Sequence, residues 1–167
     1  MHRSKPRTSL YERDFHAWLQ HTVRALRSGR WELIDRDALA EELEDMGKRD
    51  RRAIKSHLRV ILIHLLKWAT QPEMRSRGWL GSIGNARDAI SDILADSPSL
   101  AGEIAVLVPE AYLQARRQAA KETGLPAERF PSRCPWTEAV LLEAEIEAMG
   151  DLQSQGGRHQ SDADPTS

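Results

Sequence analysis

The most apolar run of the chain lies near its centre and reads VILIHLL over residues 60–66, with His64 as its single polar member. Each residue of a helix turns by about 100°. One stripe on such a helix then holds Ile54, Leu58, Ile61, Leu65 and Trp68. Leu62, Ile63 and Leu66 fall outside that stripe, and a helix that is apolar on nearly all sides is covered on nearly all sides. The run therefore predicts the central helix of a bundle.

This central helix extends toward the N-terminus. Leu39, Leu43 and Met46 continue the same stripe without a change of phase across Gly47. A glycine inside a helix costs only about 1 kcal/mol, so we predict a continuous helix over about 37–70, with a break at Gly47 as the alternative. The Gln71-Pro72 step ends the helix, because proline disfavours helical geometry in the residue before it.

A first helix is predicted ahead of the central one. Ser9 followed by Glu12 matches a capping box, and Gly29 is placed to end the helix. Its expected buried face comprises Phe15, Leu19, Val23 and Leu26, with Trp18 beside them.

Two further helices are predicted after Pro72. Ser76 or a neighbour begins the first of them. Its expected core face comprises Trp79, Ile83, Ala86, Ile90 and Ile93 or Leu94. Ser97 followed by Pro98 is typical of a helix start. That next helix contains Pro109, which is expected to kink it, and ends at Gly124.

Three prolines in residues 125–135 predict a loop that wraps the bundle, anchored by Leu125, Phe130 and Cys134. Thr137 caps a last helix that is expected to reach about Met149. Residues 1–8 and 150–167 are polar, which predicts a flexible N-terminus and a disordered tail. No strand-like alternation occurs. The chain is thus predicted to be all-α, a single domain over 9–149 with five to six helices around a long central one.

Composition narrows the class of protein. The chain has 167 residues, of which 40% are hydrophobic and 29% charged, and a net charge of −1, as in an ordinary globular protein rather than a general polyanion binder. Its single cysteine excludes an internal disulfide and a cysteine-based zinc site. No signal-peptide core and no apolar run of about 20 residues is present, so a cytoplasmic protein without a membrane partner is predicted. No cofactor or metal is predicted.

Several ordered motifs resemble a bacterial family known as domain of unknown function 29. They are YERDFHAWL, LAEELEDMG, HLRVILIHLLKWATQPEMRSRGW, DSPSL, AYLQARRQAAKETGLP and CPWT. They extend over roughly residues 11–149. The resemblance implies a compact all-α domain and brings no established activity with it.

A polar cluster follows the apolar run and is the leading candidate for a ligand site. Arginines, a lysine and an indole gather where a new helix N-terminus favours an anion, so a phosphate-bearing ligand, a nucleic acid or a protein partner is expected there. The alternative is that Trp68 and Trp79 pack the corner while the cations face water. The candidate residues are His64, Lys67, Gln71, Arg75, Ser76 and Trp79.

Arg59 and His64 form an Arg-x4-His spacing that resembles the signature of the HEPN ribonucleases. In that metal-independent chemistry the arginine would stabilise phosphate charge and the histidine would move a proton. The two residues lie about 140° apart on a helix, so a dimer or a bend would be needed to bring them together. A hydrogen-bonded histidine and a solvated arginine are the structural interpretation of the same pair.

A basic strip offers a further hypothesis. Arg52, Lys55 and Arg59 lie opposite the apolar stripe, where they could contact nucleic acid. The adjacent acidic run over residues 35–45 could neutralise them within the molecule or across a dimer. A non-enzymatic binding module is the leading hypothesis. A ribonuclease and a structural or regulatory oligomerisation protein are the alternatives.

Overall fold

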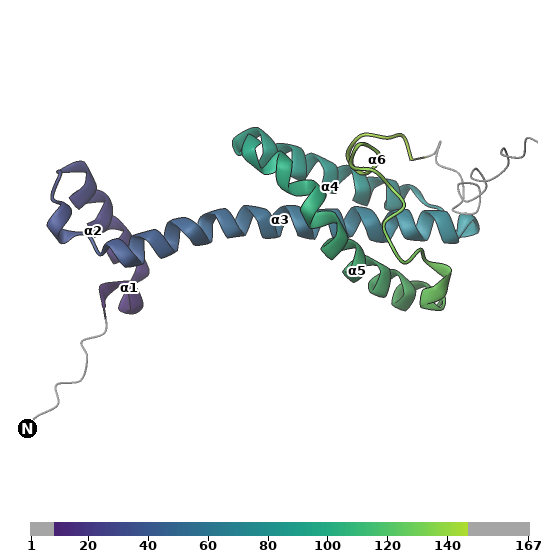
Figure 1. Ribbon diagram of the computed structural model, residues 1–167, viewed down its shortest axis with the longest axis horizontal. Coiled ribbons are helices and arrows are strands. Elements are labelled where there is room, and N and C mark those ends of the chain that lie inside the picture. Colours follow the sequence, from purple (N-terminus) through teal and green to yellow (C-terminus); the bar gives the residue numbers. More distant parts are fainter. Residues whose placement is uncertain (1–8, 147–167) are drawn as a thin grey trace, which may run out of the picture. The chain divides into compact units, whose positions relative to one another are not determined.

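The computed structural model describes residues 9–146, in which every regular element is a helix (Figure 1). The all-α prediction is therefore confirmed for this part of the chain. The predictions of a flexible N-terminus over 1–8 and a disordered tail over 150–167 lie outside the described residues.

The longest element is α3 (Arg36–Thr70), a single helix of 35 residues. It confirms the continuous helix predicted across Gly47, and the alternative of a break there does not occur. The Asp35 carboxylate accepts a hydrogen bond of 3.1 Å from the Ala38 backbone at its start. The chain divides within α3 into two compact units, residues 1–49 and 50–167, which are described in turn. The single domain predicted over 9–149 stays a prediction.

The N-terminal unit contains α1 (Leu10–Arg13), α2 (Phe15–Arg27), the short 3-10 helix η1 (Trp31–Leu33) and the beginning of α3. The capping box of Ser9 and Glu12 is confirmed. The chain forms two helices where one was predicted, because Asp14 leaves the helical region (φ −153°, ψ 88°) and caps a second helix by accepting a hydrogen bond from the Ala17 N–H. Gly29 has a φ of 67°, which suits glycine and turns the chain after α2.

The buried face of α2 differs from the predicted one. Its buried residues are Trp18, Thr22 and Ala25, whereas Phe15 is 45% and Leu19 39% exposed. Trp18 is the largest side chain of the helix, and the face that carries its indole turns inward. The Tyr11 ring meets the Trp18 ring edge-on with a centroid distance of 4.8 Å.

The C-terminal unit is built around the second half of α3, as the apolar run predicts. Packed with it are α4 (Arg77–Asp96), α5 (Ile104–Thr123) and α6 (Glu138–Leu142), joined through η2 (Pro72–Met74), η3 (Pro98–Glu103) and η4 (Ala127–Arg129). The side chains of α3 that are at most 1% exposed are Ile54, Leu58, Ile61, Leu62, Leu65 and Leu66.

Several predicted helix boundaries of this unit are confirmed. The Ser76 hydroxyl accepts a hydrogen bond from the Trp79 N–H at the start of α4. Gly124 ends α5 with a φ of 70°. Ser97 makes no side-chain cap, and a 3-10 segment precedes α5 where a regular helix start was predicted.

The Pro-rich segment is irregular, as predicted, and is held against α5. The Tyr112 hydroxyl donates a hydrogen bond of 2.8 Å to the Pro131 carbonyl, and Arg116 donates to the Ala127 carbonyl at 2.7 Å. Phe130 is 1% exposed and anchors the segment in the core.

The last helix is shorter than predicted, because α6 ends at Leu142. The Arg87 guanidinium of α4 donates three hydrogen bonds of 2.8–2.9 Å to backbone carbonyls at the end of this segment. These carbonyls belong to Val140, Leu141 and Ala144. Arg87 therefore supplies N–H donors to carbonyls at the end of α6, where the helix does not continue and its backbone N–H groups cannot do so.

Candidate functional site

Polar side chains of α3 and α5 meet in pairs whose members are 55 residues apart. Lys55 Nζ lies 3.1 Å from Glu110 Oε2, and Lys67 Nζ lies 2.9 Å from Glu122 Oε2. Between them, Arg59 Nη1 lies 3.4 Å from Gln114 Oε1. We call this set of pairs the α3–α5 row.

The regular spacing of the row follows from helix geometry. Residues four apart share one face of a helix, so Lys55, Arg59, position 63 and Lys67 all face α5. A constant offset between partners requires that the two helices run in the same direction. In Figure 1 α4 returns the chain between them, which makes α5 parallel to α3.

The middle of the row differs from its ends in charge. Where the outer pairs have glutamates, α5 has Gln114 and Gln118, and α3 has Ile63 opposite Gln118. An amide oxygen accepts a hydrogen bond from Arg59 but carries no charge to compensate the guanidinium. The centre of the row is therefore positive, although its two ends are neutral.

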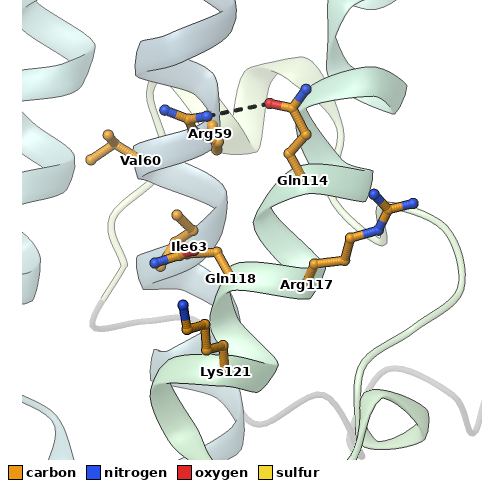
Figure 2. A pocket seen from close by; sticks show the side chains of 7 residues that line it. All are labelled: Arg59, Val60, Ile63, Gln114, Arg117, Gln118 and Lys121. Atoms are coloured by element: carbon orange, nitrogen blue, oxygen red, sulfur yellow. Dashed lines mark hydrogen bonds between the residues drawn. The ribbon is translucent and has the colours of Figure 1, made fainter.

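A cavity of about 520 Å³ lies over this positive centre. Figure 2 shows the side chains around it, with Arg59 beside Gln114, Lys121 directed toward Ile63 and Arg117 directed away from α3. We call it the α3–α5 groove. Its lining residues are Arg59, Val60, Ile63, Gln114, Arg117, Gln118 and Lys121.

Arg117 and Lys121 are exposed, and neither makes a salt bridge or a side-chain hydrogen bond with a described residue. Among the residues that the structure describes, none of those lining the groove is acidic. Three cationic side chains thus line one concave surface together with two amides, which is a composition suited to an anion.

The Glu122 carboxylate closes one end of the groove. It accepts hydrogen bonds of 2.9 Å from both Gln118 and Lys67. These two bonds, with Gln118 the larger influence, lower the pKa of Glu122 below its ordinary value. The carboxylate is therefore charged at neutral pH and is committed to neighbouring side chains.

The predicted polar corner lies directly beyond this end. Lys67 Nζ is 4.8 Å from the Trp79 ring centroid, and the His64 ring centroid is 6.4 Å from the same ring. Burial, and then the positive charge of Lys67, lower the pKa of His64, while Glu122 opposes them. His64 Nδ1 is buried and has no hydrogen-bond partner among the described residues.

The other three residues of the corner are used in local structure. Arg75 donates a hydrogen bond of 2.9 Å to the Trp68 carbonyl, and its guanidinium carbon is 5.1 Å from the Trp68 ring centroid. Ser76 caps α4, and the Gln71 N–H bonds to the Lys67 carbonyl. The structure brings His64, Lys67 and Trp79 together and turns Arg75 toward Trp68. A ligand at this corner stays a prediction.

The pair Arg59 and His64 falls into two environments. Arg59 faces Gln114 of α5 in the groove, whereas His64 faces Trp79 of α4. In the basic strip, Lys55 is paired with Glu110. Outside the strip, the neighbouring Arg51 Nε lies 3.3 Å from Glu103. In the part of the chain that the structure describes, no helix is long and apolar enough to span a membrane and no three metal-ligating residues cluster.

The α5 half of the groove is absent from the candidates chosen by sequence. A signal for it exists, because Glu110, Gln114, Gln118 and Glu122 recur every four residues on one face of a predicted helix. The same period places Lys55, Arg59 and Lys67 on α3. What the sequence does not give is the 55-residue offset that sets the two rows side by side.

Comparisons with known proteins give a family and no described relative. Neither the curated proteins nor the solved structures contain a match to this chain. The family model described as domain of unknown function DUF29 matches residues 10–150. The match extends over most of the chain, through both units and the α3–α5 groove. The chain belongs to the DUF29 family.

Proposed function

We propose that this protein is a binding module that holds a phosphate-bearing ligand in the α3–α5 groove. The observation that carries the proposal is that α5 has glutamine, and not glutamate, at the two central positions of the row. It leaves Arg59 uncompensated beside Arg117 and Lys121. If the row served only to join the two helices, a carboxylate opposite Arg59 would stabilise it further, as Glu110 and Glu122 do opposite Lys55 and Lys67.

The groove has the donors that a phosphate needs. A guanidinium binds phosphate oxygens through two parallel N–H groups, and an ammonium adds a point charge. Gln114 presents its Oε1 to Arg59, which leaves its NH2 group as a further donor. These groups come from two helices fixed by a shared core, so little ordering is needed when the ligand binds.

A thermal-shift titration with phosphate-bearing probes tests the proposal. ADP, pyrophosphate and a single-stranded RNA oligonucleotide would be added in turn, and at least one is expected to raise the melting temperature. A ligand at a hundredfold excess over its Kd stabilises by about 2.7 kcal/mol. For a chain of this size that corresponds to a rise of about 5–10 °C. If none of the three probes raises the melting temperature, the proposal is contradicted.

Three variants locate the site. Arg117→Gln and Gln114→Glu are expected to abolish the shift, because the first removes a cation and the second compensates Arg59. Arg129→Gln is the matched control, since Arg129 is exposed in η4 outside the groove. Loss of the shift in Arg75→Ala, with Arg117→Gln unaffected, would place the ligand at the polar corner instead.

The ribonuclease alternative predicts a different outcome. It requires Arg59 and His64 to act on one phosphate, whereas a binding module leaves RNA intact. Incubation of purified protein with RNA in the presence of a chelator separates the two. Cleavage that His64→Ala abolishes in a folded protein would support the nuclease over the binding module.

A further inference from the structure

The α3–α5 groove has an ion pair at each end. Lys55 and Glu110 close one end, and Lys67 and Glu122 close the other. The two pairs are twelve residues apart along α3, which at a rise of about 1.5 Å per residue is about 18 Å. The positive surface is therefore bounded in length.

Each closing pair is neutral as a whole but places a carboxylate at its end of the groove. The Glu110 side chain is 60% exposed and follows Arg59 along the row, so an anion that extended past Arg59 would approach its carboxylate. A nucleic-acid strand carries a phosphate at every nucleotide and would bring phosphates near both glutamates. A short ligand would place its charge between them and meet neither.

The charge of the groove matches a diphosphate. Three cations line it, Arg59, Arg117 and Lys121. One phosphate monoester carries about −1.5 to −2 at neutral pH, so a single phosphate leaves part of this charge unmatched. A second phosphate group brings the charge to about −3, which matches the three cations.

The α3 wall of the groove is apolar. Val60 and Ile63 are half-buried and line the groove beside the cations. In Figure 2 both project from α3 on the same stretch as Arg59. Such a wall provides a surface for the organic part of a ligand, which an inorganic anion does not use.

From these three features we infer that the ligand is a short organic diphosphate of the nucleoside-diphosphate type, and not a nucleic-acid strand. This inference rests on the proposed function and specifies the ligand class of the same groove. The bounded length sets the size of the ligand, the cations set its charge, and the apolar wall requires an organic group.

Isothermal titration of the full chain with ADP, pyrophosphate and a single-stranded RNA of about twenty nucleotides tests the inference. ADP is expected to bind about tenfold more tightly than pyrophosphate, because contact with Val60 and Ile63 adds about 1.4 kcal/mol. RNA is expected to bind more weakly than ADP. RNA that binds more tightly than ADP would overturn the inference and leave the proposed function standing.

Equal affinities for ADP and pyrophosphate would also overturn the inference, since the organic group would then contribute nothing. If none of the three anions binds, the proposed function fails as well. These outcomes separate the two claims.

A charge-matched pair of variants tests the closed end. Glu110→Gln opens the groove beside Arg59, and Asp92→Asn removes one exposed acid of α4 away from it. Glu110→Gln is expected to raise the affinity for RNA about tenfold over Asp92→Asn and to change that for ADP less than threefold. Equal RNA affinities for the two variants would overturn the role of the ion pair.

Discussion

Arg59 of α3 donates its 3.4 Å hydrogen bond to Gln114 at the position where the neighbouring pair of the row joins Lys55 to Glu110. The two pairs share their backbone register and differ in the charge of the acceptor. That difference converts a surface that would otherwise be self-neutralising into one that can accept an anion.

Gln114→Glu is expected to keep or raise the stability of the free protein. The new carboxylate would pair with Arg59 on an exposed surface, where such a pair contributes about 0–1 kcal/mol. Urea denaturation measures the free energy of unfolding. Gln118→Glu is the contrasting variant, because it places a carboxylate four residues before Glu122 and removes the bond between them. A larger loss in Gln114→Glu than in Gln118→Glu would contradict this account of the row.

Arg87→Ala is expected to lower the free energy of unfolding by about 2–4 kcal/mol. The guanidinium makes three charge-assisted hydrogen bonds to half-buried backbone carbonyls, which would lose their donors. Arg87→Lys keeps the charge and lacks the planar fork, so an intermediate loss is expected. Arg77→Lys, at the exposed start of the same helix, serves as the control and is expected to change little. Equal stability of wild type and Arg87→Ala would contradict the role of these bonds.

The stability of the protein is expected to fall as the pH decreases below about 6.5, in part through His64. Burial and the charge of Lys67 lower the pKa of His64 in the folded state below its ordinary value of 6.5. The unfolded chain then binds the proton more readily, so protonation favours unfolding. Urea denaturation at about pH 7.5 and about pH 5.5 measures the loss, which is expected to be smaller in His64→Gln. An identical loss in both proteins would contradict this assignment.

The Cys134 thiol is expected to react slowly in the folded protein. Burial raises the pKa of Cys134, and the Trp136 backbone opposes this to a smaller extent. The reactive thiolate is therefore scarce at about pH 8, and a thiol reagent should modify native protein at least about tenfold more slowly than protein in urea. Similar rates in the two states would show that the thiol is not protected.

The sequence predicts best where one local rule decides the outcome. Continuity of α3 follows from an unbroken apolar phase across Gly47, and the ends of α3 and α5 follow from Pro72 and Gly124. The buried face of α2 is predicted wrongly because the apolar pattern selects the row of Phe15 and Leu19, whereas packing buries the face that carries Trp18.

The candidate site is only half visible in the sequence. The corner around His64, Lys67 and Trp79 joins the end of one helix to the start of the next, and closeness along the chain makes it visible. The groove joins residues of α3 and α5 that are separated by all of α4. Its register is a property of the packed helices, so it appears only in the structure.

The 55-residue offset of the α3–α5 row has a consequence during synthesis. A ribosome adds about 5–20 residues per second, so several seconds pass between the emergence of an α3 residue and that of its partner. During this interval Leu62 and Leu66, which are 0% exposed in the folded protein, have no α5 to cover them. The nascent chain thus exposes an apolar helix before α5 is available to cover it. This is the stage of synthesis at which a chaperone would protect the chain most.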